Sequence, residues 1–103
     1  MKHKEWLKIW IEDYIKPQLK IQTVKKHESI VRLHIMPILG EDEIMDLSAI
    51  KLQKFVSNRV SFGLKSSTVN VIITILKMSL KTAVDVDVIR YQYSDKIKRP
   101  KLI

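Results

Sequence analysis

The chain has 103 residues, of which 19 are Lys or Arg and 11 are Asp or Glu, so its formal net charge is +8. Its apolar fraction of 46% is too high for a disordered basic tail, and its length suits a single domain. Without cysteine it cannot form disulfides, Cys-ligated zinc sites or thiol nucleophiles, and two glycines and three prolines are too few for a turn-rich β-sandwich or barrel.

The first half of the chain predicts two helices. Residues 2–16 repeat apolar side chains at helical spacing, and Pro17 ends the segment because proline lacks an N–H and crowds its predecessor. A second helix is expected to begin at Thr23, whose hydroxyl can cap the first-turn amides, and to end at Pro37 and Gly40. His27 and His34 lie on its apolar stripe, so we expect them at the core or its boundary.

The second half predicts two more helices. One spans about 49–62, with Ser48 as N-cap and Gly63 as a left-handed terminator. The next begins near 65–67 and ends at about Asp85. Its apolar stripe and its polar stripe share the helical period, the apolar one at Val69, Ile72, Ile73, Leu76, Leu80 and Ala83 and the polar one at Ser67, Asn70, Thr74, Lys77 and Lys81. With a short helix or turn near 91–97, the fold class is all-α, a compact bundle of four main helices.

Charge is distributed unevenly along the chain. The local sums are +4 over 1–34, −4 over 35–50, +6 over 51–81, −2 over 82–95 and +4 over 96–103. If the three basic segments meet in space, they form one basic face for a polyanion, and otherwise they are a solvated lysine-rich surface. No unbroken apolar stretch reaches the ~20 residues of a membrane span, and the N-terminus lacks a signal-peptide core, so we expect a soluble intracellular protein.

Residues that could do chemistry are scarce. His27 and His34 are two helical turns, about 10.5 Å, apart, too far to share a metal ion. No phosphate-binding glycine loop or nucleophile elbow is present, and the acidic run 41–46 lacks the ligand spacing of a calcium loop, which favours a solvated acidic loop. Trp6 and Trp10 fit a core better than a base-stacking platform. The sequence therefore predicts no catalytic residue, no metal and no cofactor.

Two helix N-termini carry the binding signals. Lys25 and Lys26 flank the start at Thr23, where free N–H groups and the helix dipole suit a phosphate. Ser66, Ser67 and Asn70 repeat this arrangement at the fourth helix, with hydroxyls and an amide that can donate to phosphates or base edges. Capping alone would explain Thr23 and one of the two serines, but it explains Asn70 and Thr74 less well.

The order of these features resembles the core-binding domain of phage-type tyrosine recombinases, the integrases. The most specific stretch is 34–40, His-Ile-Met-Pro-Ile-Leu-Gly, which is similar to the His-Ile-x-Pro-x-Leu-Gly signature of that family. Residues 44–55 follow its pattern of acidic loop, helix cap and Gln-x-Phe. Residues 63–70 resemble its Gly-Leu-Ser-x-x-Thr-Val-Asn run, and the tail at 97–101 is like the linker to a catalytic domain.

The resemblance implies a small SAM-like orthogonal bundle that packs on one side of duplex DNA. Gln22, Thr23 and Lys26 match DNA-facing positions, as does Ser67 with Lys65 and Asn70 nearby. The combined candidates for DNA binding are Gln22, Thr23, Lys25, Lys26, Ser29, Lys65, Ser66, Ser67, Asn70, Thr74, Lys77, Lys98 and Arg99. We expect residues 1–95 to form the DNA-binding domain and 96–103 a basic linker toward a catalytic domain that this chain does not contain.

The expected function is DNA binding in support of site-specific recombination, with no chemistry in this chain. The expected partners are double-stranded DNA, the parent's own catalytic domain and neighbouring protomers on DNA, in the cytoplasm of a bacterium and not at a membrane. Two alternatives remain open. One is a transcription regulator with a helix-turn-helix, and the other is a helical protein-interaction module that uses the apolar face at Val71, Ile75 and Met78.

Overall fold

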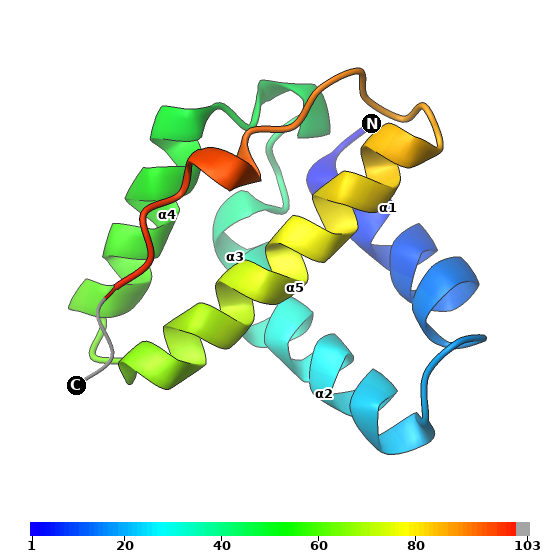
Figure 1. The fold of residues 1–103 in the computed structure, drawn as a ribbon, viewed down its shortest axis with the longest axis horizontal. Helices are drawn as coiled ribbons and strands as arrows, with labels where there is room; N and C mark the ends of the chain where they lie inside the picture. The colour runs from blue at the N-terminus through cyan, green and yellow to red at the C-terminus, as the bar shows by residue number, and fades with distance from the viewer. Residues whose placement is uncertain (101–103) are drawn as a thin grey trace.

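The computed structural model describes residues 1–100, and their regular elements are all helical, which confirms the all-α prediction. The order is α1 (His3–Trp10), η1 (Ile11–Ile15), α2 (Ile21–Ile30), η2 (Val31–Ile35), α3 (Met36–Leu39), η3 (Ile44–Asp46), α4 (Ala49–Ser61), α5 (Ser66–Asp85) and η4 (Ser94–Lys96). Figure 1 shows α5 crossing the molecule, with α4 on one side of it and α1 and α2 on the other. The element η4 is the short C-terminal helical turn expected from the sequence.

The helix α5 is the centre of the core. It contacts α1, α2, η2, α4 and η4. All six residues of its predicted apolar stripe are buried, and the structure adds Ile75 and Ser79 to them. By length and composition α5 could cross a membrane. Its place in the middle of the fold accounts for that apolar character, since a core helix needs the same side chains.

The helix α1 is joined to α5 by a buried hydrogen bond. The indole N–H of Trp6 donates to the Ser79 carbonyl at 2.9 Å, across 73 residues of sequence. Trp6 and Trp10 are 2% and 1% exposed, which confirms the core interpretation of both tryptophans. Trp10 packs against the His27 ring, with 6.1 Å between the centroids, so His27 also lies at the core boundary.

The acidic loop after α3 pairs with the free backbone N–H groups at the start of α1. The amide of His3 donates to the Asp42 carbonyl at 2.8 Å and that of Lys4 to the Gly40 carbonyl at 3.0 Å. Two N–H groups that a helix start leaves unpaired are thereby satisfied. Glu41 accepts hydrogen bonds from Lys4 and Lys2, and these bonds lower the pKa of its carboxyl to about 2. The acidic run is therefore bonded to α1 and is more than a solvated loop.

The expected start of the second helix and the expected stop at Pro37 are wrong, whereas Gly40 does end the helical path as its C-cap. The helix α2 begins at Ile21, with Lys20 at the N-cap and no side-chain cap, so Thr23 lies inside the first turn. The helical path then continues through the π-helical η2 into α3, and Pro37 sits within the first turn of α3. Proline has no N–H to donate there, so the looser π-helical turn ahead of it accommodates the ring without ending the helix.

Gly40 is required because its Cα lies close to the backbone of the preceding turn. A Cβ at this position would come within 2.4 Å of the Met36 carbonyl oxygen. The expectations for α4 are confirmed, because the Ser48 hydroxyl oxygen accepts a bond from the Lys51 amide at 3.2 Å and Gly63 has φ of 102°. A glycine is favoured at Gly63 because this φ is costly for other residues.

His3 makes the fold sensitive to acid. Its side chain is fully buried, and neither ring nitrogen has a hydrogen-bond partner. Burial lowers the pKa of His3 to about 4, against the weaker opposing effects of the Leu39 carbonyl and Asp42. The unfolded chain therefore takes up a proton at higher pH than the folded chain does. Stability is complete above the unfolded pKa of about 6.5 and is lost as the pH falls from there toward 4, by up to about 3 kcal/mol.

We predict that His3→Met removes this dependence. Urea unfolding measured between pH 7 and 5 should show the free energy of unfolding of the wild type falling by up to about 1.4 kcal/mol per pH unit more steeply than that of the variant. Parallel pH profiles for the two proteins would contradict the assignment.

The hydrogen bond from Trp6 can be measured against a matched tryptophan. Trp6→Phe and Trp10→Phe remove the same atoms from two buried sites, but only the first removes the bond to the Ser79 carbonyl. We expect Trp6→Phe to lower the free energy of unfolding by about 1 kcal/mol more than Trp10→Phe does, in chemical denaturation. Equal losses would mean that this bond adds nothing to stability.

Candidate nucleic-acid interface

A groove between α2 and α5 brings together candidates from the two halves of the chain. Its volume is about 550 Å³. It is lined by Leu19, Thr23, Lys26, His27, Asn70, Val71, Thr74, Ile75 and Met78. Four of these are predicted site residues, and none of the lining residues is acidic. The floor is apolar and the polar groups lie on its rims.

The α2 rim presents Thr23 and Lys26, both exposed and one turn apart. Nδ1 of His27 lies 2.9 Å from the Thr23 carbonyl oxygen, which orients the ring on the inner side of this rim. Lys25 is two residues from Thr23 and points to the opposite side of α2, because successive helical residues are about 100° apart. Gln22 and Ser29 also lie outside the groove lining, so the structure gathers only part of the α2 set.

The α5 rim is formed by back-bonded polar side chains. The Asn70 side-chain amide donates to the Ser66 carbonyl and the Thr74 hydroxyl donates to the Asn70 carbonyl, each at 2.9 Å. The apolar face that the protein-interaction alternative requires is smaller than expected. Ile75 is buried and Val71 is half-buried, so of the three expected residues only Met78, 40% exposed, is largely open.

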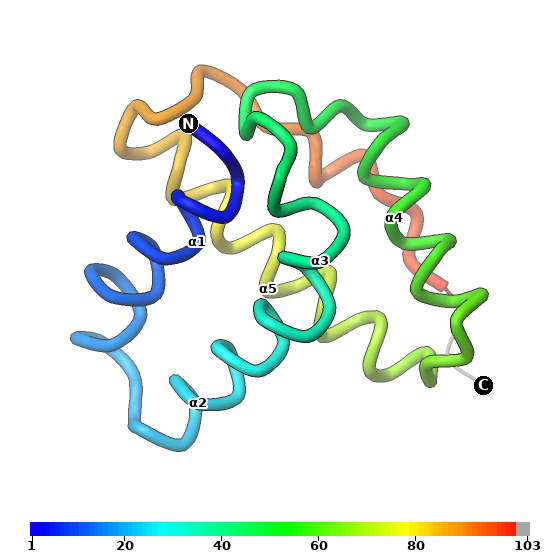
Figure 2. Tube along the Cα trace, turned by 180° about the vertical axis from the view of Figure 1, so that it is seen from behind, coloured from blue at the N-terminus to red at the C-terminus, as the bar shows by residue number. Residues whose placement is uncertain are grey.

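The C-terminal segment lies between α4 and α5 (Figures 1 and 2). The Lys98 amide donates to Gln53 Oε1 at 2.7 Å, and Gln53 Nε2 donates to the Lys98 carbonyl at 3.3 Å. Nη1 of Arg99 donates to both the carbonyl and Oδ1 of Asn70 at 3.0 Å, and Nη2 donates to the Thr74 hydroxyl at 3.2 Å. Of the two candidates in the tail, Arg99 thus reaches the α5 rim and Lys98 is bonded to α4, and residues 101–103 of the expected linker lie outside the described residues.

Lys77 is paired within the chain. Its ammonium lies 3.0 Å from Asp95, and that of Lys81 lies 4.0 Å from the same carboxylate. The hydrogen bond from Lys77 is the main reason that the pKa of Asp95 lies below its usual value. Both ends of the pair are partly exposed, so a phosphate that approaches Lys77 competes with Asp95 for its charge.

The remaining candidates stand at the start of α5. Lys65 occupies the N-cap and makes no side-chain cap bond, so the expectation that Ser66 or Ser67 caps this helix is wrong. Lys65 and Ser67 are exposed and Ser66 is half-buried. The helices α5 and α2 each follow a lysine at the N-cap position, Lys65 and Lys20.

Sequence reasoning did not assign Gln53 or Asp95 to the site. Gln53 meets its partner Lys98 across 45 residues, so no local spacing could reveal the contact. Within residues 1–100 no three His, Asp or Glu side chains gather closely enough to hold a metal ion.

A family model described as "Phage integrase, N-terminal SAM-like domain" matches residues 3–58. The integrase-like domain from Bacillus cereus superposes with a TM-score of 0.89 at 29% identity, over 97% of this chain and 84% of that one. The phage integrase SAM-like domain from Moorella thermoacetica gives 0.84 at 26% identity, over 98% and 86%. A Clostridium leptum fragment at 14% identity and TM-score 0.79 shows the shared fold alone. No curated protein sequence matches the chain.

The pair of hydrogen bonds between Gln53 and the Lys98 backbone, called the clasp below, can be tested by hydrogen exchange. We predict that Gln53→Ala speeds exchange of the Lys98 amide by about tenfold or more, since the amide loses its acceptor. The neighbouring exposed residue supplies the control, and Lys54→Ala should leave the rate unchanged. A Lys98 amide that already exchanges at the unprotected rate in the wild type would contradict the docked arrangement.

Proposed function

Because the chain belongs to the family of phage integrase N-terminal SAM-like domains, we propose that it is the non-catalytic part of a phage-type tyrosine recombinase that binds duplex DNA. The supporting observation is the groove between α2 and α5. Candidates chosen separately from two helix starts, Thr23 with Lys26 and Asn70 with Thr74, line one cavity. A face assembled from two segments can contact a duplex at more than one position, which supports the proposal.

In the proposed mode the cations neutralise phosphates and fix the orientation of the domain. Lys26 supplies a charge from α2, Lys65 from the start of α5 and Arg99 from the tail. Thr23 and the serines at the start of α5 supply neutral donors. The catalytic residues of the recombinase belong to a separate domain, to which residues 96–103 would lead. The domain would act on DNA in the bacterial cytoplasm, alongside other protomers at the recombination site.

Titration with a fluorescent duplex tests the proposal. Neutralising about 4–6 phosphates gives a slope of about −4 to −5 for log affinity against log salt, and the isolated domain should bind at about 10⁻⁴–10⁻⁶ M. We expect Lys26→Ala to weaken binding about 3- to 10-fold and to reduce the slope by about 1.

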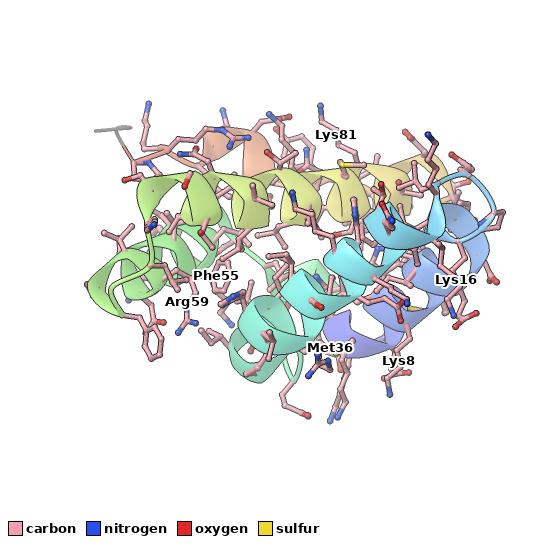
Figure 3. The ribbon with its side chains drawn as sticks, turned by 90° about the horizontal axis from the view of Figure 1, so that it is seen from below. Lys8, Lys16, Met36, Phe55, Arg59 and Lys81 are labelled. Carbon is pink, nitrogen blue, oxygen red and sulfur yellow. The ribbon has the colours of Figure 1, made fainter. Side chains whose placement is uncertain are left out.

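The matched control is Lys8→Ala, which changes net charge equally. Figure 3 shows Lys8 on the side of the molecule opposite Lys81 and α5, so this variant should bind within twofold of wild type. Equal losses for the two variants would mean that net charge, and not this face, governs binding. No binding to duplex at low salt would overturn the proposal.

A further inference from the structure

We propose that Arg99 is the phosphate-contacting cation of the α5 rim, and that Asn70 and Thr74 are positioning residues that act through it. This inference rests on the proposed function and deepens it. It changes the assignment of the two α5 side chains, which the sequence alone presents as direct contacts to DNA.

The guanidinium of Arg99 is held by three neutral acceptors. They are the carbonyl and side-chain oxygens of Asn70 and the hydroxyl oxygen of Thr74, at 3.0, 3.0 and 3.2 Å. No carboxylate pairs with it among residues 1–100. Its full positive charge therefore remains available to an anion. Lys77 differs, because Asp95 already neutralises it.

The geometry leaves donors for that anion. A guanidinium has five N–H groups, and three are engaged with Asn70 and Thr74. Within the described residues Nε–H and one Nη2–H remain without a partner. Adjacent donors on the planar guanidinium fork suit two oxygens of one phosphate, which is the bidentate geometry that makes arginine the preferred phosphate ligand.

The backbone around Arg99 is fixed before any DNA arrives. The amide and carbonyl of Lys98 are both bonded to Gln53, and Ile97 packs against the core. Asp95 anchors the segment from the other end through Lys77. An arginine held at its head group and through the backbone that precedes it loses less freedom on binding than a mobile one.

Asn70 and Thr74 are both oriented by hydrogen bonds within the chain. The Asn70 amide donates to the Ser66 carbonyl while its oxygen accepts from Arg99. The Thr74 hydroxyl donates to the Asn70 carbonyl and accepts from Arg99. One Asn70 N–H and one lone pair on each side-chain oxygen remain, but the Thr74 O–H is already used, and a contact through Arg99 keeps all of these bonds.

A double-mutant cycle on duplex affinity separates the two roles. Arg99→Ala should weaken binding about 5- to 10-fold and reduce the salt slope by about 1. Asn70→Ala should weaken binding about threefold in the wild type and by nothing further in the Arg99→Ala background. Arg99→Lys keeps the charge but loses the planar fork of donors, so its affinity for duplex should lie between those of the wild type and Arg99→Ala. The control is Thr82→Ala, which removes a similar back-bonded side chain from the far end of α5 and should leave affinity unchanged.

A second readout needs no DNA. In the free protein, Asn70→Ala should shift the Arg99 side-chain Nε–H resonance, and Thr82→Ala should not. Equal effects of Asn70→Ala in both backgrounds would show direct contact and overturn the assignment, as would tighter binding by Arg99→Ala, which would make the tail a competitor. If the wild type fails to bind duplex at low salt while the Nε–H shift is seen, the proposed function falls and the phosphate role of Arg99 falls with it.

Discussion

The fold depends on one constraint on α5, which must bury its apolar face against helices on both sides and still present a polar stripe. Helices on both sides cover its apolar residues, and the Trp6 bond to the Ser79 carbonyl ties the first helix to its far half. The polar line through Asn70, Thr74, Lys77 and Lys81 instead meets the C-terminal segment, whose Arg99 and Asp95 bond to it. A ligand that binds along this line therefore has to compete with the bonds of the C-terminal segment.

The elements with strong local signals follow from the sequence. The six apolar residues of α5, the Ser48 cap and the left-handed Gly63 are set by periodicity and by backbone sterics, which act over a few residues. The start of α2 was misplaced because Thr23 is a good cap in isolation, whereas the chain begins its helix at Ile21 with no cap bond at all. Pro37 taken alone predicts a stop, and the π-helical turn that lets the helix continue leaves no mark in the sequence.

The candidate site also has a part that local sequence patterns predict and a part that depends on distant contacts. Residue types at two helix starts and along the polar stripe of α5 predict Thr23, Lys26, Asn70 and Thr74 as site residues, and the groove unites these four. The place of the tail could not be predicted. A run such as 96–100 has the composition of a solvated linker, and the contacts of its Lys98 and Arg99 are with residues 25 to 45 positions away. Tertiary context alone decides that such a segment is docked.

The clasp between Gln53 and Lys98 also has a mechanical consequence. Tension applied to the chain beyond Pro100 would load the bonds of Arg99 first, then the two bonds of Lys98, and lastly the ion pair of Asp95 with Lys77. These contacts follow one another along the tail, so they would break one at a time while α5 keeps its buried face. The docked tail would therefore give way before the packing of the core is disturbed.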